Sequence, residues 1–446
     1  MATDNYQGIE RGGSGGTPSL GVWSLTALVV GNVIGAGFFL APAALAPYGA
    51  VAVIGWLIFT LGAMCLGIIF ARLGRLSPET GGPYAYTRKA FGDFAGFLVA
   101  WGAWISIWAS LPAIGLAAAD YLEVFLPFLQ GRPILKVGLA LAAIWSVALL
   151  NMQGVKEAGL FQLIVVAMKL VPLLGVSLVG LFYVDWSQFT PVNPSGVPFL
   201  LALAATAPLI MFAFTGVESA TVPAGDVINP RWAIPVATIA GLSIAALVYV
   251  SGTISTMGSL GLETLEKSSA PFADTATKNW GAWAGYTMAA AAILSSLAAL
   301  NGWILVMTQL PMAAARDGLL PPVFAKLNGR GVAAQGMIVS VTLASLILIF
   351  ESSGASVLIV IYDFIVNLTT TTYMVPYLFC CFVEAMLLVT HRQGARRIPP
   401  GYFTIAAIGF IFAMVTVYGA GAEAAFWALL LLLAGIPVFA WLKSRR

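Results

Sequence analysis

Charged residues are scarce in this chain: they make up 9% of its 446 residues, whereas a soluble domain typically has about 25%. Histidine occurs once, and the three cysteines lie inside apolar runs. The shortage of charge excludes a soluble globular protein. One histidine and scattered cysteines supply neither a nucleophile with its base nor a metal cluster, so we expect no enzyme activity, metal or other cofactor. A net charge of +3 is too small to indicate nucleic acid.

Hydrophobic residues, by contrast, make up 60% of the chain and gather in long runs. About 20 apolar residues in a helix span a bilayer. No ten-residue segments of alternating polarity separated by turns occur, which excludes a β-barrel. The sequence predicts an all-α polytopic membrane protein with twelve transmembrane helices, at about 22–46, 51–71, 94–122, 135–151, 159–183, 198–225, 233–258, 283–313, 333–350, 356–388, 402–421 and 424–442.

The basic residues between these runs predict the orientation in the membrane. With the N-terminus inside, sixteen of the 21 Lys and Arg residues fall on inner segments, four on outer segments and Lys169 within a span. Because inner loops carry the excess of Lys and Arg, both termini are predicted to be cytoplasmic. Residues 1–19 are polar and Gly-rich and are expected to form a disordered cytoplasmic tail. No convincing signal peptide precedes the first run.

Two of the runs contain helix-breaking sequences near their middle. The first holds three glycines within the seven residues 31–37, and the sixth holds Phe-Thr-Gly-Val-Glu at 214–218. Glycine weakens a helix by roughly 1 kcal/mol relative to alanine. Unwound backbone in hydrocarbon is tolerated only where it lines a cavity. Two such breaks in corresponding spans, five helices apart, indicate a substrate site of a secondary transporter at mid-membrane depth.

Five motifs in order along the chain resemble the amino acid/polyamine/organocation (APC) transporters, especially the bacterial arginine/agmatine and putrescine/ornithine antiporters. They are Gly-Asn-Val-Ile-Gly-Ala-Gly-Phe-Phe-Leu-Ala-Pro-Ala at 31–43, Thr-Gly-Gly-Pro-Tyr-Ala-Tyr at 80–86, Phe-Thr-Gly-Val-Glu-Ser-Ala at 214–220, Asn-Pro-Arg-Trp-Ala-Ile-Pro at 229–235 and Asp-Gly-Leu-Leu-Pro-Pro-Val-Phe-Ala-Lys-Leu-Asn at 317–328. The resemblance implies the leucine-transporter-like fold. Its first inverted repeat would be residues 20–185 (helices 1–5), its second 198–388 (helices 6–10), and residues 400–446 would form peripheral helices 11 and 12 with a short tail.

The same resemblance implies where a substrate binds. Its carboxylate would lie on bare backbone amides at the first break, where a half-helix N-terminus also offers partial positive charge. Carbonyls of the second break would accept its amino group, and Trp303 would offer an aromatic face, which can hold a cation by roughly 0.5–2 kcal/mol. Phe212 stands where the cationic antiporters carry a gating tryptophan. The predicted substrate-binding residues are Ile34, Gly35, Ala36, Gly37, Phe212, Phe214, Thr215 and Trp303.

Two charged residues within spans are predicted to act in proton coupling or gating. Glu218 matches an acidic residue of the cationic antiporters, and a carboxylate at that depth costs roughly 2.5 kcal/mol or more unless it is paired, wet or protonated. Lys169 is a candidate proton carrier, because its ammonium is removed from water. A lysine at its position resembles relatives that move neutral amino acids with protons, not the arginine/agmatine antiporter. The alternative for Lys169 is that it extends to a lipid headgroup.

Helix 10 is predicted to present one polar face to a cavity. Asp363, Asn367 and Thr370 are spaced four and three residues apart and share that face. The resemblance assigns no role to Asp363, and threonines can instead bond carbonyls of their own helix. Asn32 and Asn301 are two further candidates for the cavity wall.

The sequence therefore predicts a transporter of amino acids or polyamines that works by alternating access in a bacterial inner membrane, surrounded by lipid. Exchange of a cationic amino acid or amine is favoured slightly over proton-coupled symport of neutral amino acids, which Lys169 and Phe212 would suit. A channel is disfavoured because no repeated filter sequence occurs. The exact substrate, the participation of protons or sodium, and a homodimeric state stay open.

Overall fold

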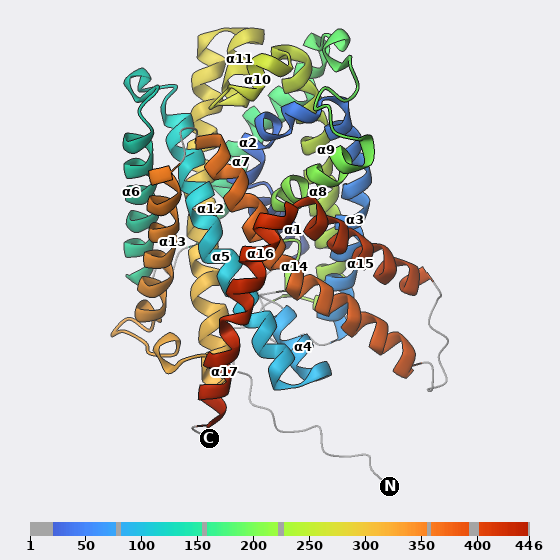
Figure 1. Cartoon of the computed structure of the whole chain (residues 1–446), viewed down its shortest axis with the longest axis vertical. Coiled ribbons are helices and arrows are strands. Elements are labelled where there is room, and N and C mark those ends of the chain that lie inside the picture. Colours follow the sequence, from blue (N-terminus) through green and yellow to red (C-terminus); the bar gives the residue numbers. More distant parts are fainter. Residues whose placement is uncertain are drawn as a thin grey trace.

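The computed structural model describes residues 21–76, 82–153, 158–221, 227–354, 358–391 and 401–444. Within these ranges the chain is built from helices, with no strands (Figure 1). The α-helices are α1 (Val22–Val33), α2 (Ala36–Leu45), α3 (Ala50–Leu76), α4 (Pro83–Phe91), α5 (Asp93–Leu122), α6 (Pro133–Met152), α7 (Ala158–Leu178), α8 (Phe199–Phe214), α9 (Pro230–Leu260), α10 (Leu262–Glu266), α11 (Pro271–Trp280), α12 (Ala282–Arg316), α13 (Ala334–Gly354), α14 (Leu358–His391), α15 (Gly401–Gly419), α16 (Gly421–Leu433) and α17 (Gly435–Ser444).

The long helices are apolar enough to cross a membrane. In the described part of the chain nine helical segments meet this requirement, and α1 with α2 makes a tenth if this bent pair is one span. Two further apolar helices, Met168–Tyr183 and Ala334–Phe350, are shorter. Each of the twelve predicted runs therefore contains a helix, which confirms the all-helical membrane architecture. Twelve crossings and the inverted repeat stay predictions.

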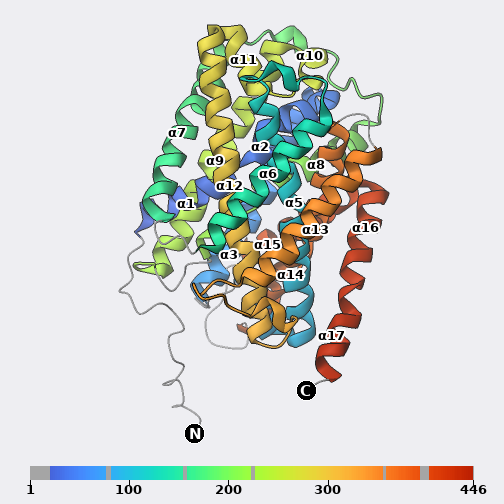
Figure 2. The ribbon, with the colours of Figure 1, turned by 90° about the vertical axis from the view of Figure 1, so that its left-hand side faces the viewer.

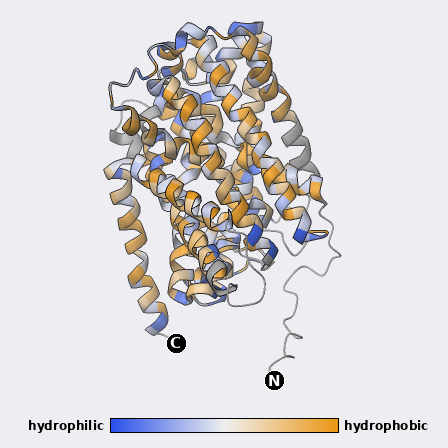
Figure 3. Ribbon diagram, turned by 90° about the vertical axis from the view of Figure 1, so that its right-hand side faces the viewer, coloured by the Kyte–Doolittle hydropathy of each residue, from blue (hydrophilic) through white to orange (hydrophobic). Residues whose placement is uncertain are grey.

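Helix α5 forms the centre of the bundle. It packs against α12, α14 and α6, and 89% of its most apolar stretch is buried inside the protein. A helix that is apolar on all sides belongs in such a position. By contrast, only 17% of the corresponding stretch in α16 and α17 is buried, and Figure 3 shows apolar residues along this outer helix pair. These two helices present their apolar side chains on the outside of the bundle.

The two ends of the bundle carry short helices that periodicity does not predict. Figures 1 and 2 place α10 and α11 at one end, called the upper end here, and α4 and α17 at the other, the lower end. The sequence predicts a loop between the second and third spans, and α4 is a helix within that loop. At the lower end Arg88 of α4 pairs with Asp317 at 2.6 Å and with Asp93 at 3.0 Å. Lys443 of α17 also pairs with Asp93, at 2.7 Å, so these charges tie four helix ends together.

Both predicted helix breaks are present. Helix α1 ends at Val33, Gly35 is extended, and α2 starts at Ala36 with the axis turned by 44°. Helix α8 ends at Phe214, and Gly216 follows with φ of +101°, which favours glycine because it has no Cβ. A short 3-10 turn, η5 (Ser219–Thr221), comes next. The glycines of the two motifs thus end helices in the middle of apolar runs.

Candidate functional site

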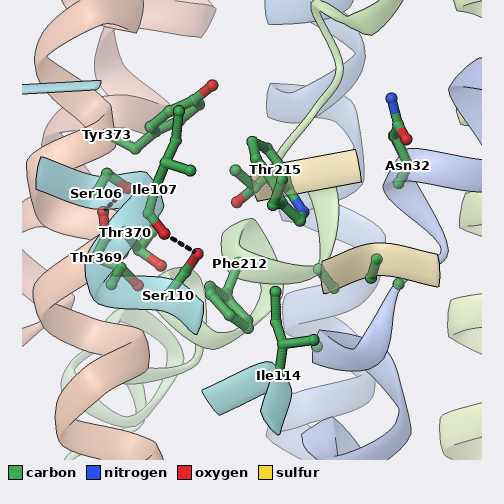
Figure 4. Close-up of a pocket in the computed structure, with 16 residues that line it drawn as sticks. Asn32, Ser106, Ile107, Ser110, Ile114, Phe212, Thr215, Thr369, Thr370 and Tyr373 are labelled. Carbon is green, nitrogen blue, oxygen red and sulfur yellow. Dashed lines mark hydrogen bonds between the residues drawn. The ribbon is translucent and has the colours of Figure 1, made fainter. Parts of the chain in front are cut away.

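A cavity lies where the two breaks meet the centre of the bundle (Figure 4). The space between its walls, including the open space at its mouth, is about 470 Å³. The walls come from α1, the first break, α5, α8, α12 and α14. The lining residues are Asn32, Val33, Gly35, Gly37, Ser106, Ile107, Ser110, Ile114, Phe212, Ala213, Thr215, Ala299, Trp303, Thr369, Thr370 and Tyr373.

The lining contains seven of the residues predicted from the sequence: Asn32, Gly35, Gly37, Phe212, Thr215, Trp303 and Thr370. It also contains a wall from α5 that sequence reasoning missed. There the Ser106 hydroxyl donates to the Thr369 carbonyl at 2.7 Å, and that of Ser110 donates to the Ile107 carbonyl at 2.8 Å. Two serines four residues apart in an apolar run were the available signal, since they share one helical face.

Aromatic rings close two sides of the cavity. The rings of Trp303 and Tyr373 meet edge to face with centroids 6.3 Å apart. Phe212 meets Tyr362 in the same way at 6.4 Å, and the Tyr362 hydroxyl donates to the Gly37 carbonyl at 2.9 Å. Tyr362 therefore holds the start of α2 beside the Phe212 ring, a contact that the sequence does not reveal.

Lys169 lies behind the first break, fully buried. Its ammonium donates to the Gly31 carbonyl at 2.8 Å and to the Ile34 carbonyl at 2.5 Å. The alternative that Lys169 extends to a headgroup is therefore wrong, because two carbonyls released by the end of α1 hold its ammonium in the interior. The ammonium occupies the back of the break and does not line the cavity.

Glu218 lies just past the second break and is nearly fully buried. Its carboxylate accepts hydrogen bonds from the hydroxyls of Tyr373 and Tyr377, the latter at 2.6 Å. Tyr373 also lines the cavity, so one side chain connects Glu218 to the cavity. Next to Glu218, the Asn32 amide donates to the Ser219 hydroxyl at 3.0 Å, which joins the two breaks directly.

Tyr249 of α9 joins the breaks a second time. Its hydroxyl lies 2.6 Å from the Val33 carbonyl and 2.9 Å from the Ala213 carbonyl. The ring is fully buried and packs against Trp56 and Phe214. The ends of α1 and α8 are thus held by one residue of a third helix.

The backbone groups offered to a substrate are fewer than predicted. The Gly35 amide already donates to the Val33 carbonyl at 2.8 Å. The Phe212 carbonyl accepts from the Thr215 amide at 3.2 Å, and the Ala213 carbonyl lies beside the Tyr249 hydroxyl. The Met211 carbonyl accepts from the Thr215 hydroxyl at 3.2 Å. The first amides of α2 are the groups that a helix N-terminus leaves without intrahelical partners.

Five predicted residues lie outside the lining. Ile34 is buried behind the break, and the Phe214 side chain packs into the aromatic core. The Asn301 side chain accepts from Asn151 of α6 at 2.8 Å. Asp363 and Asn367 lie on α14 above Thr370 and do not reach the cavity wall. The side chain of Ala36 lies outside the described residues.

Nothing in the described part of the chain resembles a metal centre, since no group of three His, Cys, Asp or Glu residues there converges on one point. The cysteines among those residues are free thiols.

Membrane-length helices around a central cavity with two unwound breaks define an integral membrane protein. A model of the amino acid permease family matches residues 20–439, and the chain belongs to that family. This confirms the resemblance to the APC superfamily.

Curated relatives narrow the class of solute. The chain is 30% identical to the cadaverine/lysine antiporter of Escherichia coli K12 over 370 residues, which cover 81% of this chain and 82% of that protein. It is 26% identical to the putrescine transporter PotE of Haemophilus influenzae over 428 residues, covering 96% and 97%. The same identity holds to PotE of Escherichia coli K12 over 442 residues, covering 96% of each. The family and these relatives are transporters, and the relatives carry amines or lysine by their names.

Proposed function

We propose that the protein exchanges a cationic amino acid for an amine across a bacterial inner membrane. The observation that carries this proposal is the cavity: among its sixteen lining residues there is no lysine or arginine, and it has the Trp303 and Tyr373 rings on one side. A cation is attracted to such aromatic faces by roughly 0.5–2 kcal/mol. The relatives named as cadaverine/lysine antiporter and putrescine transporter support the same chemistry.

In this proposal the α-carboxylate of an amino acid lies at the N-terminus of α2, whose partial positive charge favours an anion. The ammonium group faces the carbonyls at the end of α8. Glu218 lies beside the cavity behind Tyr373, so occupancy of the cavity by a cation and the charge of Glu218 are coupled through one hydroxyl. The Lys169 ammonium donates to two carbonyls of the first break, and its gain and loss of a proton are coupled to transport.

The orientation follows from the basic residues. The lower end, with α4 and α17, faces the cytoplasm in this proposal, and the upper end faces outward. Twelve crossings and two inverted repeats, 20–185 and 198–388, accompany it.

Proton-coupled symport of neutral amino acids is the second candidate, and one observation favours it. Lys169 is fully buried on two carbonyls, where a monovalent cation would suit equally well, so the loss and gain of one proton there would alter the first break.

Transport by purified protein in liposomes separates the two candidates. Vesicles loaded with unlabelled lysine or cadaverine, or left empty, receive labelled cadaverine, putrescine, lysine or leucine outside. Exchange predicts uptake of labelled cations only into loaded vesicles. Uptake of leucine into empty vesicles, driven by an inward proton gradient and unaffected by the cations, would establish the symporter instead.

A further inference from the structure

Four side-chain oxygens on α14 lack a hydrogen-bond partner among the described residues, those of Asp363, Asn367, Thr371 and Glu384, and the first two lie close together. Asp363 and Asn367 are one turn apart on one helical face, and the Oδ1 atom of each is buried without a hydrogen bond from the described residues. Buried polar groups are nearly always paired, so two orphaned oxygens side by side require an explanation. A carboxylate at membrane depth is costly when it is unpaired.

The surrounding residues do not supply the missing donors. Asp363 takes part in no ion pair among the described residues, and the Lys169 ammonium is held by the first break. Tyr362, the neighbour of Asp363, donates its hydroxyl hydrogen to the Gly37 carbonyl. The Tyr48 hydroxyl is close enough to interact electrostatically with Asp363.

Asp363 and Asn367 lie on α14 within about two turns of a residue that lines the cavity. Tyr48 ends the 3-10 turn η1 (Ala46–Tyr48) after α2, and η1 packs against α10 at the upper end. One turn of α14 below Asn367 lies Thr370, which lines the cavity. From Asp363 to Thr370 the helix rises about 10 Å. The two residues therefore lie between the start of α14 at Leu358 and Thr370 at the cavity wall.

We propose that Asp363 and Asn367 form a binding site for the primary ammonium group of the cationic substrate, above the cavity. An alkylammonium group carries three N–H donors and a positive charge, so it can bond both oxygens at once and neutralise the carboxylate. A divalent metal ion would need more oxygen ligands than this pair offers. The inference rests on the proposed function and adds the residues that distinguish cationic from neutral substrates.

The test compares four variants with the wild-type protein in proteoliposomes. Asp363→Asn removes the charge at constant size, Asn367→Leu removes the second acceptor, and Asp363→Glu retains the charge. Glu263→Gln is the matched control, because it removes one exposed carboxylate at the same end of the bundle, on α10. The readouts are KM and kcat for cadaverine exchange, and the thermal shift of each purified variant with cadaverine and with leucine.

The KM for cadaverine is expected to rise about tenfold in Asp363→Asn and about threefold in Asn367→Leu, since hydrogen bonds to charged groups are the stronger ones. The kcat should stay within about twofold, and Asp363→Glu should recover most of the affinity. Glu263→Gln should match the wild type. If Asp363→Asn does not fold, the KM values for cadaverine of Asn367→Leu and Asp363→Glu test the same inference.

An unchanged KM in Asp363→Asn and Asn367→Leu would show that Asp363 is simply protonated, and it would overturn the inference. Equal losses for cadaverine and leucine would overturn it too, because they would mark a structural role. Neither result touches the proposed function, which fails separately if the wild-type protein exchanges no cationic substrate.

Discussion

The two glycines of the first break should respond in opposite ways to one added methyl group. A Cβ at Gly37 would lie 2.7 Å from Cδ1 and 2.8 Å from Cε1 of Phe212. A Cβ at Gly35 would meet nothing closer than 3.5 Å, and the backbone there is extended, which any residue adopts. Gly37→Ala should therefore displace the Phe212 ring, whereas Gly35→Ala should be accommodated.

The magnitude follows from where that ring can go. On one side Phe212 meets Tyr362, and on the other it borders the cavity, so the ring either strains the α14 contact or enters the substrate's space. Overpacking costs about 1–3 kcal/mol, which corresponds to a loss of affinity of about 5- to 150-fold. A larger side chain such as valine at Gly37 should abolish binding.

The assay is the KM for labelled cadaverine in exchange, with thermal unfolding of the same samples as a check on folding. The double variant Gly37→Ala/Phe212→Leu should recover part of the affinity, because the smaller side chain vacates the space that the new methyl group needs. If Gly35→Ala loses as much affinity as Gly37→Ala, or if the double variant is worse than Gly37→Ala, the steric reasoning is refuted.

Three further predictions concern charge, aromatic contact and topology. Lys169→Met should give a folded protein whose cadaverine uptake no longer varies with pH, because the only ammonium on the Gly31 carbonyl is gone; an unaltered pH profile would leave Lys169 a structural role. Trp303→Leu should raise the KM for cadaverine by about two- to thirtyfold while leaving leucine binding unchanged, and equal effects on both solutes in a thermal shift assay would remove the cation–π argument. Alkaline phosphatase fused after Arg446 should be inactive in intact cells, since the basic residues predict that this end lies inside. An active fusion would mean that the predicted number of crossings is wrong by an odd number.

The helices could be predicted because the bilayer sets their length. A span needs about 20 apolar residues whatever its neighbours are, so each long run contains a helix. The short helices α4, α10 and α11 do not follow from that rule. They have 9, 5 and 10 residues and mixed polarity, and they form where the chain turns at the ends of the bundle.

The breaks could be predicted, but only part of the cavity could. Glycine spacing is local information, and it located both breaks to within a few residues. The wall from α5 depends instead on contacts such as that of Ser106 with Thr369, which are 263 residues apart in the chain. The Asn301 side chain lies outside the lining because the rotation of a helix about its axis decides which side chains face the cavity, and packing sets that rotation.

The Tyr249 hydroxyl has fewer hydrogens than it has carbonyl neighbours. A phenol hydroxyl carries a single hydrogen, yet two carbonyls from different helices lie within reach of it, those of Val33 and Ala213. At any instant one of the two receives the hydrogen and the other does not. The ends of α1 and α8 therefore compete for one donor. In the proposed function, the substrate's ammonium group would take over the α8 end and leave the phenol hydrogen to the Val33 carbonyl of α1. Binding of the substrate and the shift of one hydrogen bond between two helices would then occur together.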